Sequence, residues 1–393
     1  MFLLRTALKN CLGSGIRTWL NVSILSVVLI IMLAYNGLLD GWFERAQRES
    51  IEWEYAAGQI WCSQYDPFDA LTLADAHDRI PASLLPFLEE GTLTPALVIP
   101  ASIFPQGRMI NIELKGLEAG QQHIKIPVPA TNTATDEIPM VIGKQMAESA
   151  NLKKGDVVMT RWRDKNGTFD ARSFVVADIF DTENVNVDKA QAWMRIDQLR
   201  ELTLMEGEAT YLLCNDAFVN GKMLPADTEG WNFKDLNTLL KDILLMEEAG
   251  EAKAVFFYLI LMSLALLAVF DTQALSIFKR KREIGTYVAL GMSPGRVTLL
   301  FTLEGIMYSL LAVVVSAIWG TPVLWLFNRT GMEFPSDMYD EALFSDVMYP
   351  SFQVSSILLT IGILVVMSGI VSYFPARRIA RMNMVQALKG KIE

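Results

Sequence analysis

Few residues in this 393-residue chain have the types and spacing that catalysis or metal binding requires. The two histidines, His77 and His123, lie far apart, and neither has partners at metal-ligand or catalytic-triad spacing. The nucleotide-binding, metalloprotease and Cys-x-x-Cys motifs are absent from the sequence. We therefore expect no catalytic residue, metal site or cofactor in this chain, and we expect both histidines on the surface.

The three cysteines leave two interpretations open. Cys62 and Cys214 fall in the same polar region, where an oxidising compartment would allow them to form a disulfide. Cysteines in two different strands are as often buried thiols.

Two carboxylates lie inside strongly apolar segments. Asp271 precedes Lys279 by eight residues, and Glu304 follows Arg296 by the same number. If these segments cross a membrane, placing a carboxylate in lipid costs free energy, so both side chains should face protein or water. A proton or ion pathway is one interpretation. We favour another, in which both acids neutralise the basic residues at the cytoplasmic face and hold the helices together.

These apolar segments predict an integral membrane protein. Four of them, at residues 19–39, 254–278, 297–327 and 352–375, reach the ~20 residues that a membrane-spanning helix needs. The net charge is −10, yet Lys and Arg gather before the first span, between the second and third, and after the fourth. By the positive-inside rule, both termini and residues 279–296 are cytoplasmic. Residues 40–253 and the loop 328–351 then face outward.

The predicted fold class is a membrane α-helical protein with one span, a large extracytoplasmic α+β domain, and three further spans. The first span has no cleavage site after it and is typical of a signal anchor. Apolar residues at helical spacing predict an interfacial helix over residues 1–18, with an unstructured terminus as the alternative. Residues 376–393 form a cytoplasmic tail.

The outer region has a mixed pattern of strands and helices. Alternation and β-branched residues predict strands at residues 57–63, 109–115, 190–196 and 209–214, and helices at 143–151 and 197–204. Asn166-Gly167 predicts a hairpin between strands 156–163 and 168–180. A helical pattern from about Asn232 into the second span would form a stalk of roughly 70 Å, unless it breaks near Gly250.

The acidic character of the outer domain argues against binding nucleic acid or anionic lipid headgroups. We expect it to contact protein instead. Trp162 and Phe169 flank the hairpin turn and would be suitable interface residues if exposed. The alternative is that both pack inward on the sheet.

The segment between the second and third spans carries the most specific local pattern. Basic residues from Lys279 are followed by an apolar stripe of Ile284, Val288 and Ala289. Gly291 then predicts a stop, and Ser293-Pro294 a new helix start. We expect a short helix at the cytoplasmic face that offers a small apolar end to a partner; a basic anchor with a turn is the alternative.

These residues resemble a known family. Arg282-Glu283-Ile284-Gly285 and Ala289-Leu290-Gly291 are similar to the coupling segment of the MacB/FtsX/LolC–LolE superfamily of ABC-transporter permeases. Glu304-Gly305 and the tail at residues 375–381 and 385–389 resemble the same family, although Asn383-Met384 departs from its pattern. The order of spans is also that of the family.

The resemblance implies a permease subunit without its own ATPase. It implies partners in an ABC ATPase dimer, which would hold ATP and Mg²⁺, and in a second permease copy or paralogue. The implied location is the cell inner membrane. The residues expected to couple to the ATPase are Lys281, Arg282, Glu283, Ile284, Gly285, Ala289, Leu290 and Gly291.

Residues 141–156 and 174–180 are similar to a passage of the lipoprotein-releasing permeases. This resemblance implies release of lipoproteins from the outer leaflet. The connection at residues 161–172 is too short for the Pro-rich hook with which some relatives recruit a carrier. MacB-like efflux and FtsX-like control of a cell-wall hydrolase are the alternatives. For release, we expect a lipid-lined vestibule near Val28, Met32, Tyr35, Phe257 and Leu261.

Overall fold

The computed structural model describes residues 2–13, 15–69, 72–130, 137–221, 228, 230–333 and 347–380. These residues divide into two compact units. A helical unit holds residues 2–43, 247–333 and 347–380, and an α+β unit holds residues 44–246. The predicted tail beyond residue 380 lies outside the described residues.

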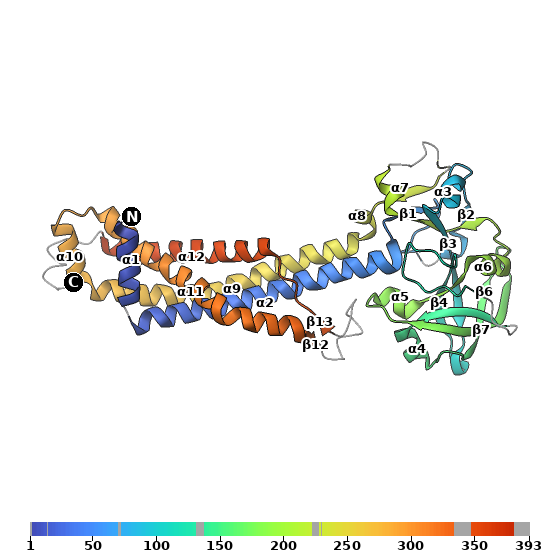
Figure 1. Ribbon diagram of the computed structural model, residues 1–393, viewed down its shortest axis with the longest axis horizontal. Coiled ribbons are helices and arrows are strands. Elements are labelled where there is room, and N and C mark those ends of the chain that lie inside the picture. Colours follow the sequence, from blue (N-terminus) through green and yellow to red (C-terminus); the bar gives the residue numbers. More distant parts are fainter. Residues whose placement is uncertain are drawn as a thin grey trace. The chain divides into compact units, whose positions relative to one another are not determined.

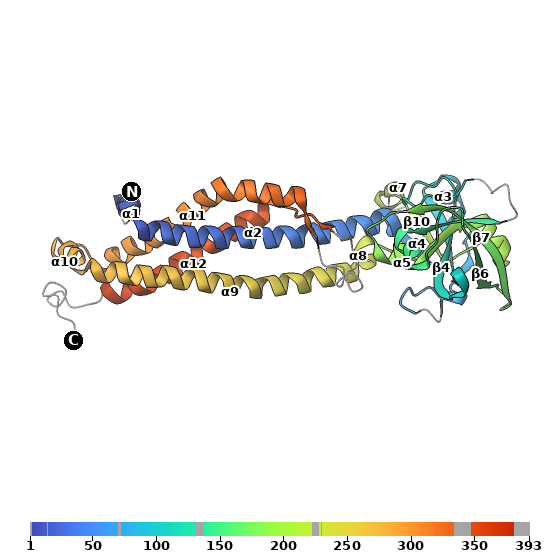
Figure 2. The same ribbon diagram turned by 90° about the horizontal axis from the view of Figure 1, so that it is seen from below.

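Four helices dominate the helical unit and run side by side (Figures 1 and 2). They are α2 (Ile16–Ser50), α9 (Lys241–Lys279), α11 (Pro294–Thr330) and α12 (Val354–Ala380). Each is long and apolar enough to cross a membrane. The shorter helices α1 (Phe2–Gly13) and α10 (Lys281–Ala289) lie at one end of this unit. The chain is therefore a membrane protein, as the apolar segments predicted.

Buried apolar side chains from α1, α2, α9, α11 and α12 form the core of the helical unit. Hydrogen bonds between helices supplement this packing. The Thr272 hydroxyl of α9 donates to the Asn21 side chain of α2 at 2.9 Å. The indole N–H of Trp319 in α11 donates to the Ser26 hydroxyl of α2 at 2.6 Å. Polar bonds of this kind fix the register of helices that share an apolar solvent.

Helices α11 and α12 lie in close contact at Gly305. A Cβ at that position would lie 1.8 Å from the Ser372 hydroxyl oxygen. The Ser368 hydroxyl donates to the Gly305 carbonyl at 3.0 Å. A glycine is therefore required for this crossing, which gives a physical reason for the Glu304-Gly305 pair.

The α+β unit is built on one mixed sheet of nine strands in the order β11-β1-β10-β3-β4-β8-β5-β7-β6. The strands are β1 (Gly58–Trp61), β3 (Leu93–Ile103), β4 (Ile110–Leu117), β5 (Ile138–Gly143), β6 (Val157–Arg163), β7 (Phe169–Phe180), β8 (Gln191–Arg195), β10 (Tyr211–Cys214) and β11 (Asn232–Lys234). A further pairing of β3 with β6 closes part of this sheet into a barrel. The long strand β3 thus belongs to the barrel and also carries β10, β1 and β11 as an extension.

The barrel interior is filled by alternate side chains of its strands. In β6 every second residue is buried, so Val158, Thr160 and Trp162 point inward. Trp162 is 1% exposed and its indole N–H donates to the Leu202 carbonyl, whereas Phe169 is 67% exposed. Of the two aromatic residues expected at the hairpin, only Phe169 is thus available to a partner.

Short elements complete the two units. In the α+β unit they are the π-helix η1 (Ile51–Tyr55), the 3-10 helices η2 (Leu73–Asp75) and η3 (Pro105–Gly107), the helices α3 (Leu85–Glu89), α4 (Lys144–Ala150), α5 (Val185–Ala190), α6 (Ile196–Thr203), α7 (Asp216–Asn220) and α8 (Leu236–Leu239), and the strand pair β2 (Asp78–Arg79) and β9 (Glu208–Ala209). Strands β12 (Met332–Glu333) and β13 (Val347–Met348) pair in the helical unit. Residues 334–346 of the predicted loop lie outside the described residues.

One expectation about the second span was wrong. Residues Asn232–Lys234, expected to be helical, form strand β11, in which Lys234 pairs with Gln59 of β1. The long helix therefore begins later than expected, at Lys241. The helix runs unbroken through Gly250, as expected, and the alternative of a break there is excluded. A Cβ at Gly250 would lie 3.1 Å from the Phe43 ring, so this glycine serves close packing.

Cys62 and Cys214 are both buried free thiols. Cys214 lies in β10, and burial raises the pKa of its thiol to about 12. Cys62 follows β1, and burial also raises the pKa of its thiol. Of the two alternatives, the buried-thiol interpretation therefore holds in this structure.

Candidate coupling site

Helix α10 is a short helix between two of the long ones. It begins after Arg280 and ends at Leu290. Gly291 has φ +93°, a conformation that L side chains rarely adopt, so the chain can turn there. Ser293 then precedes Pro294, the first residue of α11, in the favoured position for a proline at a helix start. The predicted stop and restart are both present.

Part of the coupling segment is buried within this chain and part of it is exposed. Ile284 is 5% exposed and packs in a small core with Ile277, Val297, Phe301 and Ala376, and Gly285 is also buried. Ile284 therefore anchors the helix inside this chain, with Val288 packed against the same core. The exposed candidates are Arg282, Glu283, Ala289, Leu290 and Gly291. Leu290 is 81% exposed and is the largest apolar side chain among them.

Lys281 is half-buried between these two faces. Its ammonium nitrogen lies 4.7 Å from the centroid of the Phe278 ring at the end of α9. This cation–π contact ties the first residue of α10 to the preceding helix.

A buried ion pair holds the base of α10 to α11. One guanidinium nitrogen of Arg280 lies 3.1 Å from each carboxylate oxygen of Glu304, whose side chain is 4% exposed. The same guanidinium donates to Glu283 at 2.8 Å and lies 5.1 Å from the Phe301 ring centroid. Burial disfavours the charged form of Arg280, but Glu304 and Glu283 outweigh it and raise the pKa of its guanidinium.

Helix α1 joins the same cluster. The Asn10 amide donates to a Glu304 carboxylate oxygen at 2.7 Å, and the Cys11 thiol lies 3.3 Å from the Glu304 carbonyl. Glu304 thus binds groups from α1 and from the start of α10 while itself lying on α11. The sequence indicated that Glu304 would meet basic residues, but it did not identify Arg280 or Asn10, because neither is its neighbour along the chain.

Asp271 lies apart from this cluster. Its side chain is exposed on α9 and makes no ion pair with any residue that the structure describes. A role in neutralising the basic residues stays a prediction for Asp271.

The five residues expected to line the vestibule differ in how deeply they are buried. Val28 and Met32 are buried in the core of the helical unit, so only a change in helix packing would bring them to an open surface. Tyr35 and Phe257 are half-buried, with ring centroids 4.8 Å apart, and Leu261 is half-buried as well. These three remain candidates for contact with lipid or substrate.

A protein-family model matches part of the chain. Residues 255–384, which contain α10, α11, α12 and most of α9, match the family model of the FtsX-like permease C-terminal domain. The match includes Arg280, Glu304 and every residue of the candidate coupling segment. None of the curated proteins matches the chain.

The chain is also similar to a solved extracellular domain, that of the noncanonic ABC-type transporter YknZ from Gram-positive bacteria. The likeness has 13% sequence identity and a TM-score of 0.29, and it covers 45% of this chain and 100% of that chain. A TM-score of this size does not establish a common fold.

Proposed function

We propose that this chain is the permease subunit of an ABC transporter and that the exposed side of α10 binds a separate cytoplasmic ATPase. The observation that carries this proposal is the position of α10 in the FtsX-like segment. Its inner face is buried, its base is held by the Arg280–Glu304 pair, and Arg282 and Leu290 remain exposed. Both termini and α10 would then lie in the cytoplasm, and the chain in the inner membrane.

The buried contacts make α10 suitable for transmitting motion. A partner that moves α10 would also move α11 through Glu304 and α1 through Asn10, because these groups are bonded to one another. ATP and Mg²⁺ would be bound and hydrolysed on the ATPase dimer. The residues of this chain would supply the docking surface and the mechanical connection.

For the substrate, we propose lipoproteins that are released from the outer leaflet of the membrane with a second permease copy or paralogue. The similarity of residues 141–156 and 174–180 to the lipoprotein-releasing permeases supports this substrate. Tyr35, Phe257 and Leu261 are half-buried and are the residues proposed to contact acyl chains.

One observation favours a second candidate. Strands β6 and β7 are joined by a tight turn in which the Asp164 amide donates to the Thr168 carbonyl at 2.8 Å. This turn leaves no room for an extended carrier-recruiting hook. A MacB-like efflux or force-transmitting permease would not need such a hook.

Depletion of the protein, followed by fractionation of acylated proteins, tests the substrate. Accumulation of lipoproteins in the inner membrane is the expected result. Unchanged lipoprotein sorting together with altered tolerance to drugs or peptides would instead support efflux. Altered cell-wall hydrolysis without either change would support the FtsX-like regulatory role.

A further inference from the structure

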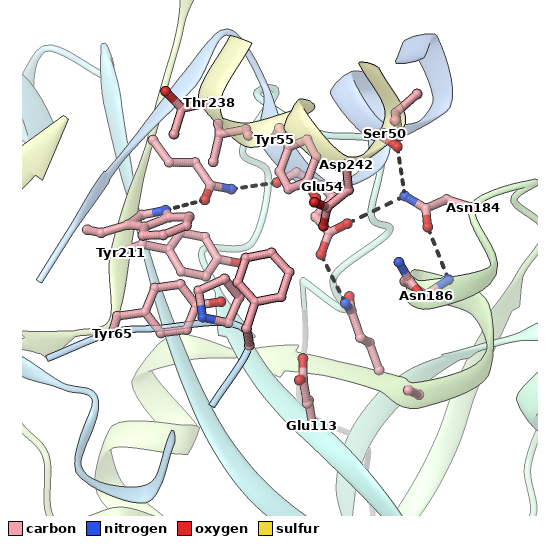
Figure 3. A pocket seen from close by; sticks show the side chains of 18 of the residues that line it. Ser50, Glu54, Tyr55, Tyr65, Glu113, Asn184, Asn186, Tyr211, Thr238 and Asp242 are labelled. Carbon is pink, nitrogen blue, oxygen red and sulfur yellow. Dashed lines mark hydrogen bonds between the residues drawn. The ribbon is translucent and has the colours of Figure 1, made fainter. Parts of the chain in front are cut away.

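A cavity of about 470 Å³ lies within the α+β unit, a volume in the range of small-molecule sites. Its walls come from the end of α2 with η1, from β4 and β10, and from α8 and the first residues of α9. Figure 3 shows Glu54, Tyr55 and Asp242 close together on one side, and Tyr65 beside Tyr211 on another. A π-helical turn such as η1 is rare and often marks a functional site.

The charged side chains of the cavity are mostly acidic. Glu54, Glu113 and Asp242 line it, and Lys115 is the basic residue among the lining side chains. The Lys115 ammonium lies 3.3 Å from a Glu113 oxygen and 3.7 Å from a Glu54 oxygen, with its side chain 3% exposed. One ammonium cannot balance three carboxylates, so the cavity keeps an excess of negative charge.

The Glu54 carboxylate is held in place by neutral donors as well. The Gln191 amide donates to one of its oxygens at 3.2 Å, and the Asn184 amide lies 3.4 Å from the other. These bonds orient the carboxylate and the Gln191 side chain at the cavity wall before any ligand arrives.

Two buried polar atoms in the lining have no hydrogen-bond partner among the described residues. They are the hydroxyl oxygen of Tyr211, a residue that is 2% exposed, and the amide oxygen of Gln191, a residue that is 3% exposed. Buried polar atoms in folded proteins nearly always have partners. Burial raises the pKa of the Tyr211 hydroxyl well above its usual value, with Glu54 and Glu113 adding to the effect, so this group stays neutral. The Gln191 oxygen can only accept, so its missing partner must be a donor.

Aromatic rings form much of the remaining wall. The Tyr65 ring lies 5.8 Å from the Tyr211 ring and 5.0 Å from the Trp61 ring, measured between centroids. Phe68, also in the lining, is 81% exposed. Aromatic faces attract cations and also bury apolar groups.

We propose that this cavity binds a small organic cation, a protonated primary amine on an apolar body. An ammonium group supplies the donors that the Gln191 oxygen and the Tyr211 hydroxyl oxygen lack, and it balances part of the excess charge of Glu113 and Asp242. The apolar body fits against Tyr65 and Phe68. An anion would meet like charge, and a neutral analogue would leave the carboxylates without a counter-charge. The site does not depend on which substrate the transporter moves.

Isothermal titration of the full chain in lipid nanodiscs with tryptamine at pH 7 tests the proposal. We expect saturable 1:1 binding. The neutral analogue tryptophol should bind at least 10-fold more weakly, and indole-3-propionate should not bind. Absence of saturable tryptamine binding, or equal binding of tryptamine and tryptophol, would overturn the proposal.

Two variants locate the site. Asp242→Asn removes a charge from an exposed lining residue and should weaken tryptamine binding about 5-fold or more. Tyr211→Phe removes only the hydroxyl, so it should weaken binding while leaving the thermal unfolding temperature equal or higher. Glu206→Gln, an exposed carboxylate outside the lining, is the matched control and should bind normally. Unchanged affinity in both cavity variants would place tryptamine elsewhere and contradict the assignment.

Discussion

Arg280 and Glu304 form a buried pair in which one guanidinium nitrogen lies 3.1 Å from both carboxylate oxygens. Arg280 lies just before α10, and Glu304 is the eleventh residue of α11. The pair therefore joins the short helix proposed to meet the ATPase to a helix long enough to cross the membrane. Since the Asn10 amide binds the same carboxylate, α1 is part of the connection.

Replacing Glu304 with Gln should loosen α10 from α11. The amide keeps one acceptor for Asn10 but removes the buried counter-charge of Arg280, which then has only the exposed Glu283. Breaking a buried pair costs about 3–5 kcal/mol. Hydrogen exchange of the full chain should show faster exchange in α10 and unchanged exchange in the β3–β4 core. In the double variant Arg280→Gln with Glu304→Gln, the loss of stability should be smaller than the sum of the single losses. Strict additivity would mean that the pair is not coupled.

Changes on the exposed side of α10 should act on the partner and not on the fold. Arg282→Glu and Leu290→Asp alter exposed side chains, so the thermal unfolding temperature should change little while co-purification of the ATPase falls by about 10-fold or more. Gly285→Leu is the contrast, because Gly285 is buried and the added side chain should destabilise α10 itself. ATPase recovery at the wild-type level with both surface variants would contradict docking at α10.

Local patterns predicted much of the fold. Asn166-Gly167 fixed the hairpin of β6 and β7, and Gly291 with Ser293-Pro294 marked the ends of α10 and α11. Strand β3 was missed because nearly all of its residues are buried, so it lacks the alternation of a half-exposed strand, and it also contains Pro95 and Pro100.

The sites could be predicted only in part. The α10 segment was predicted from its sequence, but the burial of Ile284 was not, because Phe301 and Ala376, which cover Ile284, come from distant parts of the chain. The amine-binding cavity left no local signal, since Glu54, Lys115 and Tyr211 meet only through the pairing of the sheet and the end of α2. The spacing of residues along the chain does not reveal contacts that arise only when the sheet brings distant segments together.

Gly305→Ala should separate α11 from α12. The new methyl group would lie 1.8 Å from the Ser372 oxygen, and overpacking of this kind costs about 1–3 kcal/mol. Gly362→Ala in α12 is the matched control, since nothing lies within 4 Å of its added Cβ. Adding Ser372→Gly to Gly305→Ala removes the obstructing side chain and should restore part of the thermal stability. Equal unfolding temperatures for Gly305→Ala and Gly362→Ala would show that the two helices do not cross closely at Gly305.

Asp188 should make the α+β unit less stable as the pH rises. Asp188 is 1% exposed, and burial raises the pKa of its carboxyl group from 3.8 to about 6. An acid whose folded pKa is raised stabilises the fold in its protonated form. Its contribution is therefore fully present below about pH 3.8 and is lost as the pH rises through about 6.

Asp188→Asn should remove this dependence. The amide oxygen can still accept the bond from the Gln145 backbone N–H, which Asp188 accepts at 3.1 Å. The variant should exceed the wild type in stability by on the order of 2 kcal/mol above pH 6.5, and the difference should shrink toward zero near pH 4. Thermal unfolding of both full chains between pH 4 and pH 7.5 measures it, with Asp216→Asn, an exposed acid, as the control. A difference between Asp188→Asn and the wild type that stays constant over this range would mean that Asp188 does not titrate near pH 6.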